Sequence, residues 1–245
     1  MSTYTFDVNE ALVQACYSDE DIQNIYLPLI RQWEMLQKEK KQRIMIFVPA
    51  PPGCGKTTFV YFLEYLSKTY CSSNLQALGI DGFHYPQAYL KTHYVNLENE
   101  NVCLNDIKGN PLTFDVEKLE SYIQKSLTED VRWPYYSRKL HDVVEDVVDV
   151  HSDILLLEGN YLLLDQPPWS QLKQYCSSSL FLNIGRDVLI QRLIERKMMT
   201  GKSRDEAKDF VYNSDLKNVD CILAYSTNAD HTILFDQDNS VKEFK

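Results

Sequence analysis

The sequence predicts an α/β protein with one doubly wound, mainly parallel sheet of about five strands and helices on both faces. Short aliphatic runs alternate along the chain with stretches of helical periodicity, which is the pattern of parallel strands joined by crossover helices. Several of these runs end in a glycine or an acid, where open α/β sheets bind ligands. A chain of 245 residues with 44% hydrophobic residues can build this core as a single domain over residues 1–245.

The composition restricts the partners that we expect. A net charge of −10 opposes attraction to nucleic acids and anionic lipids. The six cysteines lack CxxC spacing, so we expect neither a zinc site nor a disulfide framework. No basic leader precedes an apolar core, and no apolar run reaches the ~18 residues of a membrane span, so we expect a cytoplasmic protein. The sequence does not define an oligomeric state and is compatible with a homo-oligomer.

Residues 1–41 are predicted to form a helical extension that packs on the domain. Asp7, with Glu10 three residues later, resembles a capping box, and Ser18 offers a second helix start. A stripe of apolar residues at helical spacing follows, and Pro28 within it is expected to kink or restart the helix.

A phosphate-binding loop is predicted at residues 50–57, between an aliphatic strand at 44–48 and a periodic helix. The spacing is that of the P-loop, with Ala50 in place of the usual first glycine. Backbone N–H groups in such a loop surround phosphate, Lys56 reaches the β and γ phosphates of ATP, and Thr57 binds Mg²⁺. The residues expected to contact the nucleotide are Gly53, Cys54, Gly55, Lys56, Thr57 and Thr58.

Two acids follow predicted strands and are expected near the P-loop. Asp81 follows the strand at 75–80, and a catalytic role competes there with that of a turn residue before glycine. Glu158 ends the aliphatic run at 153–157, where a role in holding Mg²⁺ or substrate competes with capping or packing.

Aromatic and basic residues near these strand ends are candidates for the wall of a substrate site. Arg138 and His141 can serve substrate contact or a surface ion pair equally well. Tyr85, Tyr135, Tyr136 and Tyr161 are suited to such a wall, although aromatic residues at strand ends are as often part of the core.

Taken together, these motifs resemble the P-loop kinases that include uridine kinase, pantothenate kinase and phosphoribulokinase. The resemblance runs in motif order over roughly residues 25–235 and is strongest for a bacterial nucleoside/nucleotide kinase-like branch. The segment 134–137 is also similar to one in pantothenate kinases. The motifs that carry the resemblance to the bacterial branch lie at 81–86, 108–115 and 158–165.

The resemblance implies transfer of the γ-phosphoryl group of Mg²⁺-ATP to a hydroxyl of a small metabolite, such as a nucleoside, a sugar or a pantothenate-like compound. It implies a helical lid at about 186–205, whose Arg192 and Arg196 act in catalysis with Lys56 and Asp81. The matching motifs add Phe83, His84 and Asn160 to the expected substrate contacts. Ser137 stands where uridine kinases have an aspartate that holds the ribose, which argues against uridine.

Two other functions remain open from the sequence. A nucleoside monophosphate kinase would accept phosphate on a phosphate, which needs arginines more than the carboxylate of Asp81. A regulatory module would bind ATP, hydrolyse it slowly and signal through a partner without a phosphorylated product.

Overall fold

A six-stranded sheet forms the centre of the molecule. The computed structural model describes residues 1–8, 11–97 and 99–245. The strand order is β12-β11-β10-β3-β9-β4, and only β12 at the edge runs antiparallel to its neighbour. The predicted doubly wound, mainly parallel sheet with a central P-loop strand is therefore confirmed, with β12 as an additional strand. The strands are β3 (Ile44–Val48), β4 (Leu75–Gly79), β9 (Ile154–Glu158), β10 (Ser178–Ile184), β11 (His231–Phe235) and β12 (Val241–Phe244).

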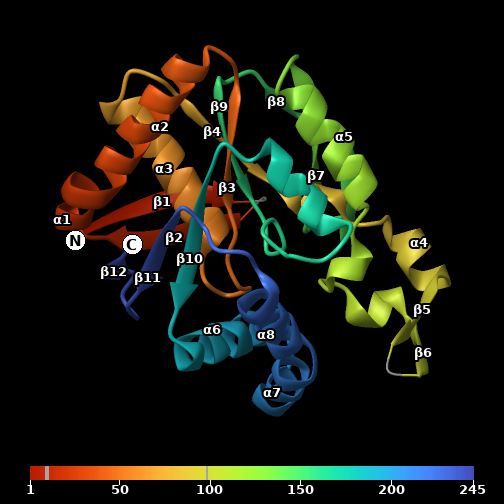
Figure 1. The fold of residues 1–245 in the computed structure, drawn as a ribbon. Coiled ribbons are helices and arrows are strands. Elements are labelled where there is room, and N and C mark those ends of the chain that lie inside the picture. The colour runs from red at the N-terminus through yellow and green to blue at the C-terminus, as the bar shows by residue number, and fades with distance from the viewer. Residues whose placement is uncertain (9–10, 98) are drawn as a thin grey trace.

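Helices cover both faces of this sheet (Figure 1). On one face lie α2 and α3, on the other lies α5, and α6–α8 gather beyond the carboxyl ends of the strands (Figure 1). The α-helices are α1 (Asp19–Asp21), α2 (Leu27–Lys40), α3 (Lys56–Tyr70), α4 (Gln87–Thr92), α5 (Val116–Ser126), α6 (Arg186–Met198), α7 (Arg204–Phe210) and α8 (Leu216–Tyr225). Among the described residues, no helix is long and apolar enough to span a bilayer.

The side chains of the aliphatic strands pack into two separate hydrophobic cores, one on each face of the sheet. In β3, Ile44 and Ile46 pack toward α2 and α3, whereas Met45 and Phe47 pack toward the α5 side. Each of these side chains is fully buried, as expected for a strand covered on both faces. Although every residue of β3 is apolar, successive side chains point to opposite faces of the sheet, so the strand contributes to both cores.

Residues 2–8 and 11–17 form a β-hairpin, so the prediction of a helix there is wrong. Strands β1 (Ser2–Val8) and β2 (Ala11–Tyr17) pair antiparallel in continuous register. Along β1 exposure alternates with period two, and its threonine and aromatic residues favour a strand. Asp7 lies inside β1 and caps no helix, and Glu10 lies outside the described residues.

The helical prediction is confirmed from residue 19 onward. Ser18 caps α1, accepting a hydrogen bond of 3.4 Å from the backbone N–H of Asp21. A π-helical segment, Ile22–Tyr26, leads directly into α2, and Pro28 is the second residue of α2, directly after the change of helical pitch.

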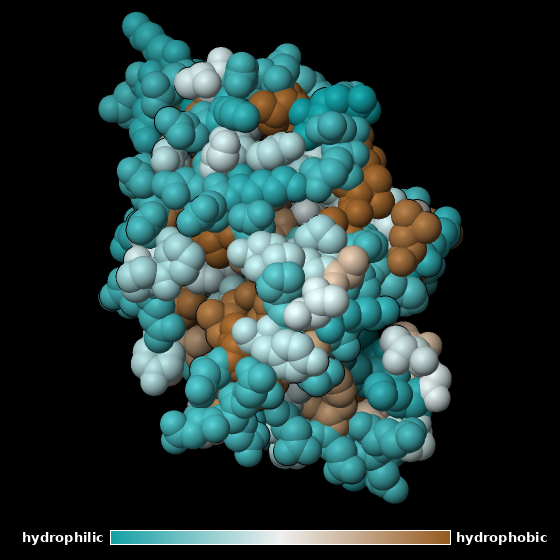
Figure 2. All heavy atoms as spheres, turned by 90° about the vertical axis from the view of Figure 1, so that its right-hand side faces the viewer, coloured by the Kyte–Doolittle hydropathy of each residue, from teal (hydrophilic) through white to brown (hydrophobic). Residues whose placement is uncertain are grey.

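Two further hairpins extend from the sheet. They are β5 (Tyr94–Leu97) with β6 (Glu100–Cys103), and β7 (Val131–Ser137) with β8 (Asp142–Val150). Figure 2 shows the side of the molecule that carries α4, α5 and β5–β6 as a mostly hydrophilic surface with hydrophobic patches set into it.

Candidate active site

The P-loop joins β3 to α3 in the conformation that phosphate binding requires. Gly53 and Gly55 have φ values of +84° and +89°, a region that favours glycine. A Cβ at Gly53 would also stand 3.0 Å from the side chain of Leu193 on α6. Helix α3 begins at Lys56, directly after the loop, so its positive end faces any anion held there.

Glu158 lies against the start of α3. The hydroxyl of Thr57 donates a 2.8 Å hydrogen bond to Glu158 Oε1, and Lys56 Nζ lies 3.7 Å from Oε2. Glu158 is only 4% exposed. Burial raises the pKa of this carboxyl, the charge of Lys56 lowers it, and that of Asp81 raises it further.

These donors fit a magnesium ion. Mg²⁺ prefers oxygen ligands and usually keeps several waters, so it needs only one or two protein groups beside the phosphates. The hydroxyl of Thr57 and the buried carboxylate of Glu158 are both oxygen donors, and they already lie within hydrogen-bonding distance of each other.

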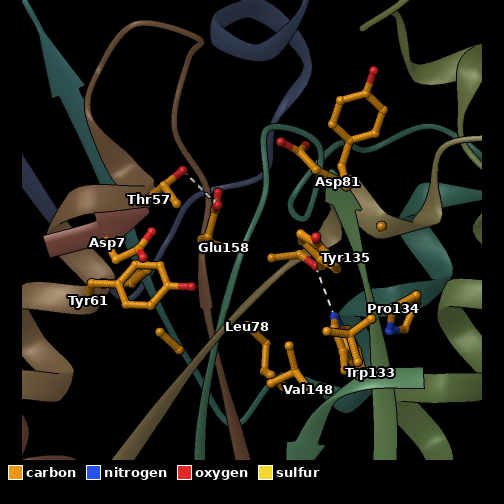
Figure 3. Close-up of a pocket in the computed structure, with 16 residues that line it drawn as sticks. Asp7, Thr57, Tyr61, Leu78, Asp81, Trp133, Pro134, Tyr135, Val148 and Glu158 are labelled. Carbon is orange, nitrogen blue, oxygen red and sulfur yellow. Dashed lines mark hydrogen bonds between the residues drawn. The ribbon is translucent and has the colours of Figure 1, made fainter. Parts of the chain in front are cut away.

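A cavity of about 440 Å³ opens beside this pair (Figure 3). Asp81, in the turn directly after β4, lies on its wall together with Thr57 and Glu158. The two predicted acids and the P-loop therefore meet at one site. The remaining lining comes from β1, α3, β4 and the β7–β8 hairpin: Asp7, Val60, Tyr61, Ala77, Leu78, Gly79, Gly82, Trp133, Pro134, Tyr135, Tyr136, Val147 and Val148.

The predicted substrate-contact residues are distributed unevenly around this cavity. Tyr136 lines it. Phe83 and Tyr161 are fully buried in the core on the α5 side, where they can support a wall but not contact a ligand at its surface. His84 packs its ring on Phe114 at 3.8 Å, and burial lowers the pKa of its imidazole.

Other predicted contacts lie away from the cavity. Arg138 and His141 are exposed in the turn between β7 and β8, and Tyr85 stacks on Tyr89 with ring centres 4.5 Å apart. Asn160 has a buried Oδ1 without a hydrogen-bond partner among the described residues.

The two predicted lid arginines have different surroundings. Arg192 on α6 donates to the backbone oxygen of Gln237 at 3.0 Å and to Asn239 Oδ1 at 2.9 Å. A Cβ at Gly55 would stand 3.9 Å from its Nη1, so this guanidinium lies beside the P-loop. Arg196, one turn later, is exposed. A joint catalytic role for Arg192 and Arg196 stays a prediction.

A second cavity, of about 210 Å³, lies on the other side of the P-loop. Cys54, Gly55 and Thr58 contribute the loop side of its wall, and Arg192 and Asn239 contribute the opposite side. Its remaining lining comes from β2, α3 and β11: Val13, Gln14, Ala15, Tyr17, Phe59 and Phe235.

Three residues at the site were missed from the sequence. Asp7 and Tyr61 line the larger cavity, and Lys108 Nζ lies 2.9 Å from the hydroxyl of Tyr136. Tyr61 follows Thr57 by one helical turn and was detectable on that ground. Lys108 begins the motif at 108–115 and was detectable on that ground, whereas Asp7 reaches the site through the long-range packing of the hairpin, for which the local sequence carries no signal.

Comparison with known proteins agrees with this geometry. Residues 45–241 match the "Phosphoribulokinase / Uridine kinase family". The chain belongs to this family. Its members are phosphotransferases of the small-molecule kinase class with an alcohol group as acceptor, so the predicted enzyme class is confirmed.

Individual relatives agree with this assignment. The chain is 37% identical to the "Uncharacterized protein YggC" of Escherichia coli K12, over 91% of both chains. It is 28% identical to a pantothenate kinase of Enterococcus faecalis, over 72% of this chain and 62% of that one. Among solved structures, it resembles the "putative fructose transport system kinase" of Silicibacter sp. TM1040, with a TM-score of 0.70, 28% identity, and coverage of 78% of this chain and 89% of the other.

Proposed function

We propose that this kinase transfers the γ-phosphoryl group of Mg²⁺-ATP to a hydroxyl of a small metabolite bound in the larger cavity. The observation that carries the proposal is the position of the P-loop between two cavities, with Asp81 and Glu158 on the wall of only one of them. Nucleotide on one side and acceptor on the other suit the in-line geometry of phosphoryl transfer.

Each residue then has a distinct task. The ammonium of Lys56 and the guanidinium of Arg192 neutralise charge on the transferring group, while the backbone N–H groups of the loop hold the phosphates. Thr57 and Glu158 would hold Mg²⁺, which would supply positive charge beside the phosphates. Asp81 orients the acceptor hydroxyl and receives its proton.

A phosphate acceptor suits the larger cavity less well. Among its described lining residues there is no lysine, arginine or histidine, whereas three are acids. A nucleoside monophosphate would bring its negative charge against these acids without a partner. The cavity therefore favours a hydroxyl acceptor over a monophosphate.

The deciding experiment is a panel of hydroxyl-bearing metabolites assayed for ADP release, with the mass of each product measured. We expect one chemical class to gain 80 Da, the mass of one phosphoryl group, by the stoichiometry of transfer (about one group per ADP). Lys56→Ala should abolish transfer, whereas Lys68→Ala, an exposed lysine on the same helix, should not. ADP release without any phosphorylated product would support a slow ATPase module instead.

A further inference from the structure

The N-terminal hairpin borders both cavities, although it precedes the part of the chain that matches the family. Asp7 on β1 lines the larger cavity, and Val13, Gln14 and Ala15 on β2 line the smaller one. The hairpin is held on α3 by ring packing. Tyr17 stacks on Phe62 at 3.9 Å, and Tyr4 meets the same ring at 4.8 Å.

Asp7 is placed to meet a ligand in the larger cavity. Figure 3 shows it beside Tyr61 on the P-loop side, across the cavity from Asp81. Its carboxylate is exposed and forms no ion pair among the described residues. Burial raises the pKa of the neighbouring Tyr61, and the charges of Glu64, Glu158 and Asp7 raise it further.

The charge of Glu158 is compensated by neighbouring cations, whereas that of Asp7 is not compensated among the described residues. Glu158 faces Lys56 at 3.7 Å and would also face Mg²⁺, so its charge is compensated. Asp7 has no such partner, and its charge acts on the contents of the cavity. The opposite end of the same cavity is apolar, with Leu78, Trp133 and Val148 on its wall.

We infer that Asp7 is a specificity residue, which accepts a hydrogen bond from a hydroxyl or ammonium group of the acceptor and excludes acceptors that carry a carboxylate or phosphate. The inference rests on the proposed function and narrows it. The acceptor is then an uncharged or cationic polyhydroxy compound with one apolar face, such as a sugar ring or a nucleoside. A cavity of about 440 Å³ suits a molecule of this size.

The test compares matched acceptors with wild type and Asp7→Asn. Each carboxylate is paired with its neutral carboxamide, a hexuronate with its uronamide and a ribonucleoside 5′-carboxylate with its 5′-carboxamide, because the two members lack the same hydroxyl and differ in charge. Wild type should favour the neutral member of each pair. Asp7→Asn should lower kcat/KM for the neutral acceptor by ~10-fold to 100-fold, the usual worth of a hydrogen bond to a charged group. The lower kcat/KM should come from a higher KM for the acceptor. The preference for the neutral acceptor over the carboxylate should become smaller.

The control is Glu20→Gln, which removes one exposed carboxylate at the start of the first helix, outside both cavities. It should leave unchanged both kcat/KM for the neutral acceptor and the preference for that acceptor over the carboxylate. Transfer with the same neutral-to-carboxylate ratio in wild type and Asp7→Asn would overturn the role of Asp7 and leave the proposed function standing. A wild-type preference for carboxylate acceptors would do the same. Absence of transfer to every compound, with ATP hydrolysis in water retained, would overturn both.

Discussion

Two carboxylates at neighbouring strand ends have opposite environments. Asp81 is exposed at the rim of the larger cavity, whereas Glu158 is buried against Thr57 and Lys56. Because a metal needs a fixed charged oxygen and an acceptor needs a reachable one, we expect Glu158 to serve the metal and Asp81 to serve the acceptor.

Replacing Asp81 with asparagine keeps its size and removes its charge. We expect turnover to fall by ~10²-fold to 10⁴-fold, the usual contribution of a general base. Affinity for Mg²⁺-ATP should stay within a few-fold, because Thr57 and Glu158 are untouched. Single-turnover transfer measured beside calorimetric nucleotide affinity separates the two effects. An equal loss in both would assign Asp81 to the metal.

Replacing Glu158 with glutamine should change how stability depends on pH. Burial is the main cause that raises the pKa of Glu158 in the folded protein above its usual 4.5. A raised carboxyl pKa means that ionisation costs stability, so the free energy of unfolding of the wild type falls as pH rises from the unfolded value of 4.5 up to the raised folded value. Without metal or nucleotide, Glu158→Gln should therefore become more stable relative to wild type as pH rises above 4.5.

Urea unfolding at several pH values measures this difference. Glu20→Gln removes a carboxylate that is exposed, and its difference from wild type should not vary with pH. If the difference in free energy of unfolding between Glu158→Gln and wild type also did not vary with pH, burial would not determine the pKa of Glu158.

At the scale of elements, helix α6 presents its two arginines differently. Arg192 is tied to the loop after β11 by Gln237 and Asn239, beside the P-loop, whereas Arg196 is exposed. We expect Arg192→Ala to lower turnover more than it lowers ATP affinity, because charge on the transferring group is greatest in the transition state.

Arg196→Ala is the matched control on the same helix. It should have little effect on turnover if α6 keeps the observed position during phosphoryl transfer. A comparable loss of turnover from both variants would mean that α6 moves on closure to bring Arg196 to the phosphates. Pre-steady-state transfer with each single variant distinguishes these outcomes.

The elements also show what the sequence could and could not predict. The strands at Ile44–Val48 and Leu75–Gly79 were predicted, because strands covered on both faces have runs of largely apolar residues. The hairpin was missed because the acids at 7 and 10 resembled helix caps and outweighed the two-residue alternation of β1. The meeting of Asp81 with Glu158 was predictable, since parallel strands end at one edge of the sheet.

Across the whole molecule, nucleotide binding should stabilise the fold measurably. At 100 times its Kd, a non-hydrolysable ATP analogue with Mg²⁺ should add about 2.7 kcal/mol to the free energy of unfolding. For a domain of this size each kcal/mol raises Tm by about 2–4 °C. Differential scanning fluorimetry detects such a shift. Lys56→Ala should reduce it, and the analogue without Mg²⁺ serves as the reference.

Strand β7 packs closely against the turn that carries Asp81, and this contact limits where the cavity lining can change by substitution. A Cβ at Gly82 would stand only 2.3 Å from the carbonyl oxygen of Pro134, and the indole of Trp133 donates to Gly79 at 2.9 Å. Val147 and Val148 on β8 line the same cavity without taking part in either contact. Substitutions in β8 can therefore alter the lining of the cavity without disturbing the contacts that position the turn of Asp81.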